Sequence, residues 1–482
     1  MKSNKIIQVF FFFLIVFSLV SCRQRDQGIN CYENFKTRSP VKWVFMLYMN
    51  GDNNLEGFAV EDLNELEMGL YNLQQSNPSD YAEVRAVVFF DRIEGEYTSS
   101  SGDWSNTRFY EVVPDNNMNR TVSTVVANYE EMDLGDPETL TFFLNKVKQY
   151  YPADNYYLDI WNHGGGTRSI LPLPGKSRAV GSRHSSKTKT KAASWDDTSG
   201  SVMYLYQIQQ GIENAGFSGS DRLEVLGFDC CLMGMTEVAY EFRGFARYFV
   251  GSMATVLGDG WDYDGLFADL DADSITGRDF AVRTVDVFAA SLGGNTNDQT
   301  MAASNLGNIA ALKASIDALG VSIYNNIPVG AQKDSFETNT RDQAVHFFSG
   351  NSESMANPSF DLWDLCDQIE DDYNGALETA AGNVKADLAN VIEKGYAGSD
   401  YGDYSGTDRG LAIFFSQGEK TDHYYQQEWY SSLRMSDYYP NSNYRYGRID
   451  FCTANGNGSV ETWKELFEAW YDPNNTDTHD AF

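Results

Sequence analysis

One histidine and one cysteine stand at the ends of predicted β-strands, where their side chains can do acyl-transfer chemistry. His163 lies two residues after the predicted strand 157–161 and precedes three consecutive glycines. Cys231 follows the run 223–228 and precedes apolar residues at helical spacing. A thiol and an imidazole are a sufficient nucleophile and base for acyl transfer. We therefore predict that His163 and Cys231 form a catalytic dyad.

The residues next to this pair favour the same chemistry. Glycines after His163 leave backbone N–H groups free to bind an oxyanion, and we expect the N–H groups of Gly164 and Cys231 to do this. A thiol at a helix N-terminus gains thiolate character, which we expect for Cys231. Its neighbour Cys230 is expected to point the opposite way, into the core, as free cysteines usually do.

The elements that must position these residues alternate between buried strands and helices. Residues 41–49 form an apolar run that suits a strand buried on both faces, and further strands are predicted at residues 84–90, 157–161, 223–228 and 248–253. Residues 55–70 have helical spacing, and Asp136 followed by proline predicts the start of another helix. This alternation predicts an α/β fold, a mainly parallel sheet with helices on both faces. Side chains at the carboxyl ends of its strands then share one edge.

The N-terminal residues predict export. Lys2 and Lys5 precede an apolar run over residues 6–20, which is shorter than the ~20 residues that cross a bilayer. Leu-Val-Ser-Cys at residues 19–22 resembles a bacterial lipobox. We therefore expect residues 1–21 to be a signal peptide and Cys22 to carry lipid. The protein would be a lipoprotein on the outer-membrane, periplasmic or cell-surface face, with residues 22–38 as a polar tether.

Charge separates one segment from the rest of the chain. The 482 residues carry a formal net charge of −32, which excludes a general nucleic-acid partner. Residues 175–193, by contrast, are rich in Gly, Ser and Thr and contain bases but no acid, so we expect an exposed, flexible loop. Its basic residues are Lys176, Arg178, Arg183, Lys187, Lys189 and Lys191. The cysteines include no Cys-x-x-Cys spacing, so no structural zinc site is predicted.

Residues 161–166 (Trp-Asn-His-Gly-Gly-Gly) and 228–234 (Phe-Asp-Cys-Cys-Leu-Met-Gly) resemble the paired motifs of the clostripain family of cysteine peptidases. Residues 48–56 and 258–263 are similar to two further blocks of that family, and the similarity covers residues 41–305 best. The resemblance implies a caspase-like sheet, His163 as base, Cys231 as nucleophile, and cleavage after Arg or Lys. The chain departs from the family at Cys230, where a small residue such as alanine is usual.

The resemblance also implies further roles. Asp229 and Asp259 correspond to the acids that bind the basic side chain of the substrate. Related peptidases are often cut between the histidine and the cysteine, which makes the six bases of the loop 175–193 candidates for self-activating cleavage. The product would be a monomer of two associated chains acting on protein or peptide substrates. No cofactor is required, and calcium stays open because some relatives depend on it; the acidic stretch from Asp259 does not have the spacing of a calcium loop.

The predicted organisation is a catalytic domain over residues 39–306 and a smaller mixed, largely helical C-terminal region over residues 307–482. Two other functions fit the sequence. A catalytically silent surface lipoprotein that binds glycans or proteins would use the many tyrosines and tryptophans, and an amidase would use the same dyad. The intact pair of strand-end residues argues against the silent binder. Comparing the cleavage of Arg and Lys ester and amide substrates with that of other substrates would distinguish the peptidase from the amidase.

Overall fold

A ten-stranded sheet forms the centre of the computed structural model, which describes residues 31–94, 102, 104–167, 193–292, 297–347, 359–401, 409–415, 449–453 and 460–471. The strand order is β1 (Tyr32–Glu33), β5 (Thr124–Asn128), β4 (Arg108–Glu111), β3 (Val84–Arg92), β2 (Val41–Gly51), β6 (Ala153–Trp161), β9 (Leu223–Asp229), β10 (Ala246–Gly251), β11 (Thr300–Asn305) and β13 (Ile392–Ala397). The five inner strands, β3 to β10 in this order, are parallel, and the strands outside them are antiparallel. The predicted α/β fold is confirmed.

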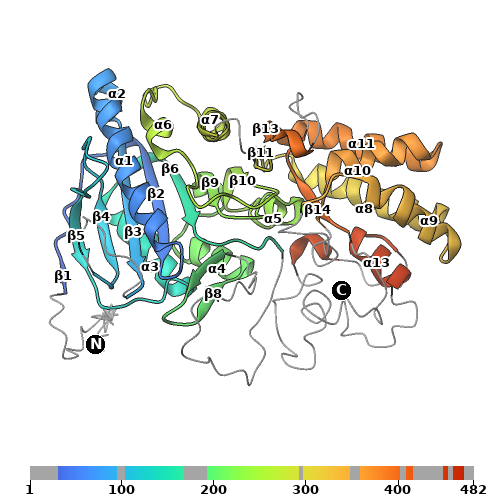
Figure 1. Ribbon diagram of the computed structural model, residues 1–482, viewed down its shortest axis with the longest axis horizontal. Helices are drawn as coiled ribbons and strands as arrows, with labels where there is room; N and C mark the ends of the chain where they lie inside the picture. Colours follow the sequence, from blue (N-terminus) through green and yellow to red (C-terminus); the bar gives the residue numbers. More distant parts are fainter. Residues whose placement is uncertain are drawn as a thin grey trace, which may run out of the picture.

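Helices cover both faces of the sheet because its inner strands are apolar on both sides. In β2, Val44 and Met46 join one hydrophobic core and Phe45 and Leu47 join the other. Helices α3 (Pro137–Tyr150), α4 (Leu205–Asn214) and α5 (Thr236–Glu241) pack on the first core. Helices α1 (Glu56–Ser76), α6 (Tyr263–Phe267) and α7 (Gly277–Ser291) pack on the second, as Figure 1 shows for α1, α6 and α7.

Residue patterns in the sequence predict where helix α3 begins, but they do not predict the short outer strands. Helix α3 begins as predicted, since the Asp136 side chain accepts a hydrogen bond of 2.9 Å from the backbone N–H of Glu138. The antiparallel strands β4 and β5 were not predicted, because they are short and partly exposed. Strand β1 lies within the predicted tether, so the chain already pairs with the sheet at Tyr32, before residue 38.

The C-terminal region is attached to the sheet rather than set apart from it. It contains α8 (Ile309–Asn326), α9 (Ala331–Asn339), α10 (Leu362–Asp372), α11 (Ala376–Val391), α13 (Trp463–Tyr471), β12 (Ser359–Asp361) and β14 (Ala412–Phe414). Figure 1 shows its helices α8, α9 and α11 at the end of the molecule opposite β1 and β5. Strand β13 follows residue 307 in sequence, yet it pairs with β11. The predicted division at residues 306 and 307 therefore cuts through one sheet.

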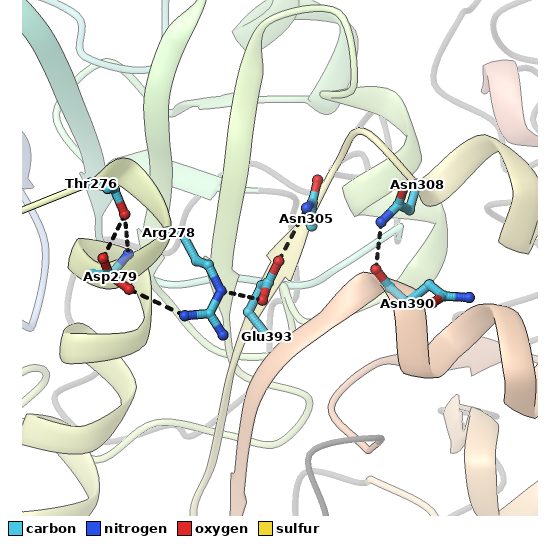
Figure 2. Close-up of polar contacts among 7 residues, drawn as sticks. All are labelled: Thr276, Arg278, Asp279, Asn305, Asn308, Asn390 and Glu393. Atoms are coloured by element: carbon cyan, nitrogen blue, oxygen red, sulfur yellow. Dashed lines mark hydrogen bonds and ion pairs between the residues drawn. The ribbon is translucent and has the colours of Figure 1, made fainter.

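Polar contacts fasten this junction (Figure 2). Arg278 on α7 donates from Nε to Glu393 on β13 at 2.6 Å, and Asn305 on β11 donates to the same carboxylate at 3.1 Å. Asn308 donates to the backbone carbonyl of Asn390 at 2.6 Å. Because Glu393 contacts both an adjacent strand and a helix, it fixes β13 against the parallel core.

Some predicted features lie outside the described residues. These are the signal peptide, Cys22 and, in the basic loop, Lys176, Arg178, Arg183, Lys187, Lys189 and Lys191. Cys31 is disulfide-bonded, whereas Cys230, Cys231 and Cys366 are free thiols. Among the helices that the structure describes, none is both long enough and apolar enough to span a membrane.

Candidate functional site

The ends of two neighbouring parallel strands bring His163 and Cys231 to one edge of the sheet. Strands β6 and β9 pair with Trp161 opposite Asp229, so each candidate residue lies two positions beyond a paired residue. Gly164 lies against the cysteine turn: a Cβ built there would overlap the carbonyl oxygen of Cys231 and come within 3.0 Å of its backbone nitrogen. Only glycine allows the two backbones to approach this closely.

The thiol of Cys231 is half-buried and surrounded by backbone donors. The N–H of Val256 donates to Sγ at 3.3 Å, and the N–H groups of Gly164 and of Cys231 itself also lower the pKa of the thiol. Burial outweighs them and raises the pKa of Cys231 above its ordinary value. The predicted help from a helix N-terminus is wrong, because α5 begins only at Thr236.

A strained turn takes the place of that helix terminus. Leu232, the residue after the candidate nucleophile, has φ of 62°, in the left-handed region that non-glycine residues seldom adopt. Its N–H donates to the carbonyl of Ala254 at 2.9 Å. Cys230 is buried, and its Sγ donates to the carbonyl of Ile160 at 3.1 Å, which agrees with the predicted inward direction. The turn thus leaves Cys231 half-buried and Cys230 fully buried.

Two residues that the sequence did not reveal hold His163. Its Nε2 lies 3.0 Å from Oδ1 of Asn54, in the turn after β2, and its ring packs edge-on against Trp195 with 5.8 Å between centroids. Trp195 belongs to β7 (Ala193–Asp196). Burial lowers the pKa of His163, and the charge of Asp197 opposes this. The one sequence signal for Asn54 was the Asn-Gly-Asp-Asn-Asn turn at the end of a strand.

The pKa shifts of both residues favour the neutral form of the side chain. A raised thiol pKa keeps the proton on Cys231, and a lowered imidazole pKa keeps His163 free to accept one. Burial disfavours the charged form of each group.

Asp229 is buried at the end of β9, and backbone and phenol donors satisfy it. Its Oδ2 accepts from the N–H of Trp261 at 2.9 Å and lies 3.1 Å from the hydroxyl of Tyr263, which is also 2.8 Å from Oδ2 of Asp159. Burial raises the pKa of Asp229 to about 7. A buried carboxylic acid that titrates near neutrality beside a candidate nucleophile is typical of functional sites.

Asp259 lies in the turn that covers Asp229. The side chain of Asp259 is exposed, and the next residue, Gly260, has φ of 59°. A Cβ at Gly260 would come within 2.5 Å of Oδ2 of Asp229, so the turn packs directly on the carboxylate. The two aspartates are therefore close in the fold, one buried and one at the surface.

One group of described residues has spacing suited to a metal ion. Its four ligand atoms lie within 4.8 Å of one another, and its residues are Asp52, Asp91, Glu131 and Asp196. The acidic stretch from Asp259 has a different use, since Asp262 accepts a hydrogen bond of 2.7 Å from the N–H of Gly265 and caps α6.

Comparison with known proteins agrees with this geometry. Residues 47–463 match the clostripain family. The chain is 27% identical to clostripain of Hathewaya histolytica over 496 aligned residues, which cover 90% of this chain and 88% of that protein. Two solved structures share the fold. The secreted C11 cysteine protease "iotapain" of Bacteroides thetaiotaomicron has a TM-score of 0.55 and 17% identity over 78% of this chain and 94% of that one. An inactive zymogen C11 protease from Parabacteroides distasonis has a TM-score of 0.55 and 17% identity over 83% and 98%.

Proposed function

The chain belongs to the clostripain family of cysteine peptidases, and on this premise we propose that it is an exported endopeptidase that cleaves after Arg or Lys. The observation that carries the proposal is the contact between the two strand-end turns, in which Gly164 packs against the backbone of Cys231. It supports the proposal because the candidate base and the candidate nucleophile follow adjacent parallel strands, so that one substrate carbonyl would approach both.

In the proposed reaction, the sulfur of Cys231 attacks the carbonyl carbon of the residue before the scissile bond while His163 accepts the thiol proton. The tetrahedral intermediate collapses as His163 passes that proton to the leaving amine, which gives a thioester and a free amino terminus. His163 then takes a proton from water, whose oxygen attacks the thioester. Collapse of the second intermediate releases the acid and restores the thiol.

The backbone N–H groups of Gly164 and Cys231 are the proposed oxyanion donors. Both act on the Cys231 sulfur in the resting protein. A carbonyl oxygen that arrives beside the sulfur would meet the same donors. Donors that are fixed before the substrate binds stabilise the developing charge without reorganisation, and removing one such donor typically costs about 100-fold or more in rate.

Specificity for a basic side chain is assigned to Asp229, with Asp259 in a lesser role. Asp229 keeps Oδ2 engaged by Trp261 and Tyr263, which leaves Oδ1 for a guanidinium or ammonium group. A charge-assisted bond in a buried site discriminates strongly against neutral residues. Asp259 is exposed, so water screens its charge and its contribution is smaller.

Reporter peptides that differ only in the residue before the scissile bond test the proposal. We expect cleavage after Arg or Lys and little after Leu. Cys231→Ala should abolish turnover, and the matched change Cys230→Ala should retain most of it, because that buried thiol faces away from the site. Turnover in Cys231→Ala, or equal cleavage after Leu and Arg by the wild type, contradicts the assignment.

We also propose that the enzyme activates itself by cutting the basic loop between residues 175 and 193. Two observations support this. The segment carries the residue types that Asp229 would select, and a relative from Parabacteroides distasonis exists as an inactive zymogen. After cleavage, β6 and β9 would still hold the two chains together. Purified wild type should give two fragments with a new N-terminus after Lys or Arg, and Cys231→Ala should stay intact. A fully active protein that remains a single chain rules this out.

Lipid on Cys22 is the proposed anchor, and the secreted relative from Bacteroides thetaiotaomicron supports export. The mature protein should fractionate with membranes, whereas Cys22→Ser should be soluble or remain unprocessed. Mass spectrometry of the N-terminal peptide provides the direct measurement, because it distinguishes a lipidated Cys22 from one with a free or disulfide-bonded sulfur. An unchanged membrane fraction in Cys22→Ser would contradict the anchor.

A further inference from the structure

Four carboxylates from separate segments meet beside the turn that holds His163. Asp52 follows β2, Asp91 lies in β3, Glu131 lies between β5 and α3, and Asp196 ends β7. Their ligand oxygens lie within 4.8 Å of one another. We propose that these four residues, the cation-site group, bind one divalent cation of the calcium class.

Two buried oxygens inside the group have no hydrogen-bond partner. These are Oδ1 of Asp52 and Oδ2 of Asp91, and both residues are fully buried. Leaving a buried acceptor unsatisfied is costly, so native structures usually pair it with a donor, a water or an ion. In the part of the chain that the structure describes, no Lys, Arg or His forms an ion pair with any member of the group.

The chemistry and spacing of the donors suit calcium. All four ligands are oxygens, which hard cations prefer, and calcium–oxygen bonds of about 2.3–2.6 Å place opposite ligands about 4.6–5.2 Å apart. Magnesium requires shorter bonds of about 2.0–2.1 Å in a strict octahedron. Glu131 is exposed, so the site opens to solvent on one side and a cation can enter.

Surrounding groups already orient the ligands. The Thr107 hydroxyl donates to Oδ1 of Asp91 at 2.9 Å, and the N–H of Thr198 donates to Oδ2 of Asp52 at 3.2 Å. The N–H of Leu134 donates to Asp196 at 3.0 Å. Contacts of this kind behind the ligands are what hold a metal site in shape before the ion arrives.

Position links the site to the catalytic histidine. Asp52 lies two residues before Asn54, and Asp196 directly follows Trp195, the two residues that contact His163. Asp196 is also downstream of the basic loop, whereas the other three ligands are upstream. The cation would therefore fasten the chain that follows the loop to the ends of β2 and β3, before and after any cleavage.

Direct binding tests the proposal without relying on catalysis. The chain is prepared in the Cys231→Ala background, stripped with EDTA and titrated with calcium chloride or magnesium chloride in a calorimeter. We expect one calcium ion per chain, weaker magnesium binding, and a melting temperature that rises with calcium concentration. Because this background has no nucleophile, failure of the peptidase proposal would leave these results unchanged.

Matched variants locate the ion. Glu131→Gln removes a ligand charge at an exposed position that folding should tolerate, and Asp91→Asn removes one inside. Each should weaken calcium binding about tenfold or more. The adjacent change Glu130→Gln should leave the affinity within about twofold, because Glu130 is outside the group. Absence of calcium binding at millimolar concentrations, tighter magnesium than calcium binding, or full affinity in Glu131→Gln overturns the proposal.

Discussion

Two sets of carboxylates, most of them buried, lie at the same edge of the sheet, and they differ in how their oxygens are hydrogen-bonded. In the first, the Tyr263 network, Asp159 and Asp229 share the Tyr263 hydroxyl, and Asp229 also accepts from the N–H of Trp261. In the second, the cation-site group, two carboxylate oxygens have no hydrogen-bond partner. Protein donors complete the first set, whereas the second calls for an ion.

The two sets also bear on opposite members of the dyad. Asp229 is two residues before Cys231, so the Tyr263 network shapes the nucleophile side and the surface that would meet a basic side chain. Asp52 of the cation-site group belongs to the same turn as Asn54, so this group shapes the histidine side. Changes in one set should therefore leave the property governed by the other intact, and this separation can be measured.

The largest expected effect follows from removing the charge of Asp229. Asp229→Asn keeps the shape and an acceptor for the Trp261 N–H but cannot pair with a guanidinium group. We expect kcat/KM for an Arg reporter to fall about 100-fold or more. Calcium affinity should not change, because Asp229 lies outside the cation-site group. Equal losses for Arg and Leu reporters, or a parallel loss of calcium binding, would break the proposed separation.

Tyr263→Phe tests how far protein donors complete the first set. The change removes a hydroxyl that lies between two buried carboxylates and leaves acceptors without a donor. We expect a loss of about 1–3 kcal/mol in the free energy of unfolding, measured by urea denaturation at pH 8. Thr284→Val, elsewhere in the same core, removes a hydroxyl that pairs with Tyr157 rather than with a carboxylate, and should cost less. If the two variants lose equal amounts of unfolding free energy, the loss in Tyr263→Phe does not come from the hydroxyl that the two carboxylates share.

The pH profile provides a third test. The pKa of Asp229 is about 7, so its charge is lost below neutrality, while the lowered pKa of His163 keeps the imidazole neutral there. Below pH 7, kcat/KM for an Arg reporter should fall about tenfold per pH unit. Asp229→Asn should lack this limb. A limb that persists in the variant must belong to another group.

Stability should follow the opposite trend, because folding raises the pKa of Asp229 from 3.8 to about 7. A proton held more tightly in the folded state stabilises it below pH 3.8, and this contribution is lost as the pH rises to about 7. An asparagine does not titrate, so the stability of Asp229→Asn should not fall in this way as the pH rises. Urea denaturation at pH 5 and pH 8 should therefore show the variant gaining stability relative to the wild type at the higher pH.

The sequence predicted the elements that are continuous and buried. Strands β2, β6 and β9 appear as mainly apolar segments because both of their faces are covered, and the positions of their carboxyl ends follow from these segments. The positions of His163 and Cys231 were predictable for that reason. Strand β13 is half-buried and has no such run, so its place at the sheet edge emerged only from pairing with β11.

Contacts between distant segments were beyond the reach of local patterns. Asn54 and His163 are 109 residues apart, and Asp159 and Tyr263 are 104 apart. Apolar spacing after Cys231 predicted a helix at once, yet the chain first makes a turn with Leu232 in the left-handed region. The spacing of apolar residues indicates which residues face the core. A turn can bury the residues after Cys231 as a helix would, so this spacing does not distinguish the two.

The smallest predicted effect concerns Asn54. This residue contacts His163 and lies in the turn that also carries Asp52 of the cation-site group. An Oδ1 that accepts from Nε2–H fixes the tautomer in which Nδ1 is free to act as the base. Asn54 is exposed, so Asn54→Ala should leave the melting temperature and calcium affinity unchanged while lowering kcat up to about tenfold.

Asn54→Asp should restore the contact and raise the pKa of His163, because a carboxylate favours the imidazolium. The low-pH limb that belongs to the histidine would then move to higher pH in Asn54→Asp alone. If Asn54 has a purely structural role, Asn54→Ala should lower the melting temperature, and Asn54→Asp should not shift the pH profile. If Asn54→Ala loses calcium binding, the turn is also needed for the cation site and the two sets are not separate. If the tautomer is what matters, the rate and the pH profile change while stability and calcium binding do not.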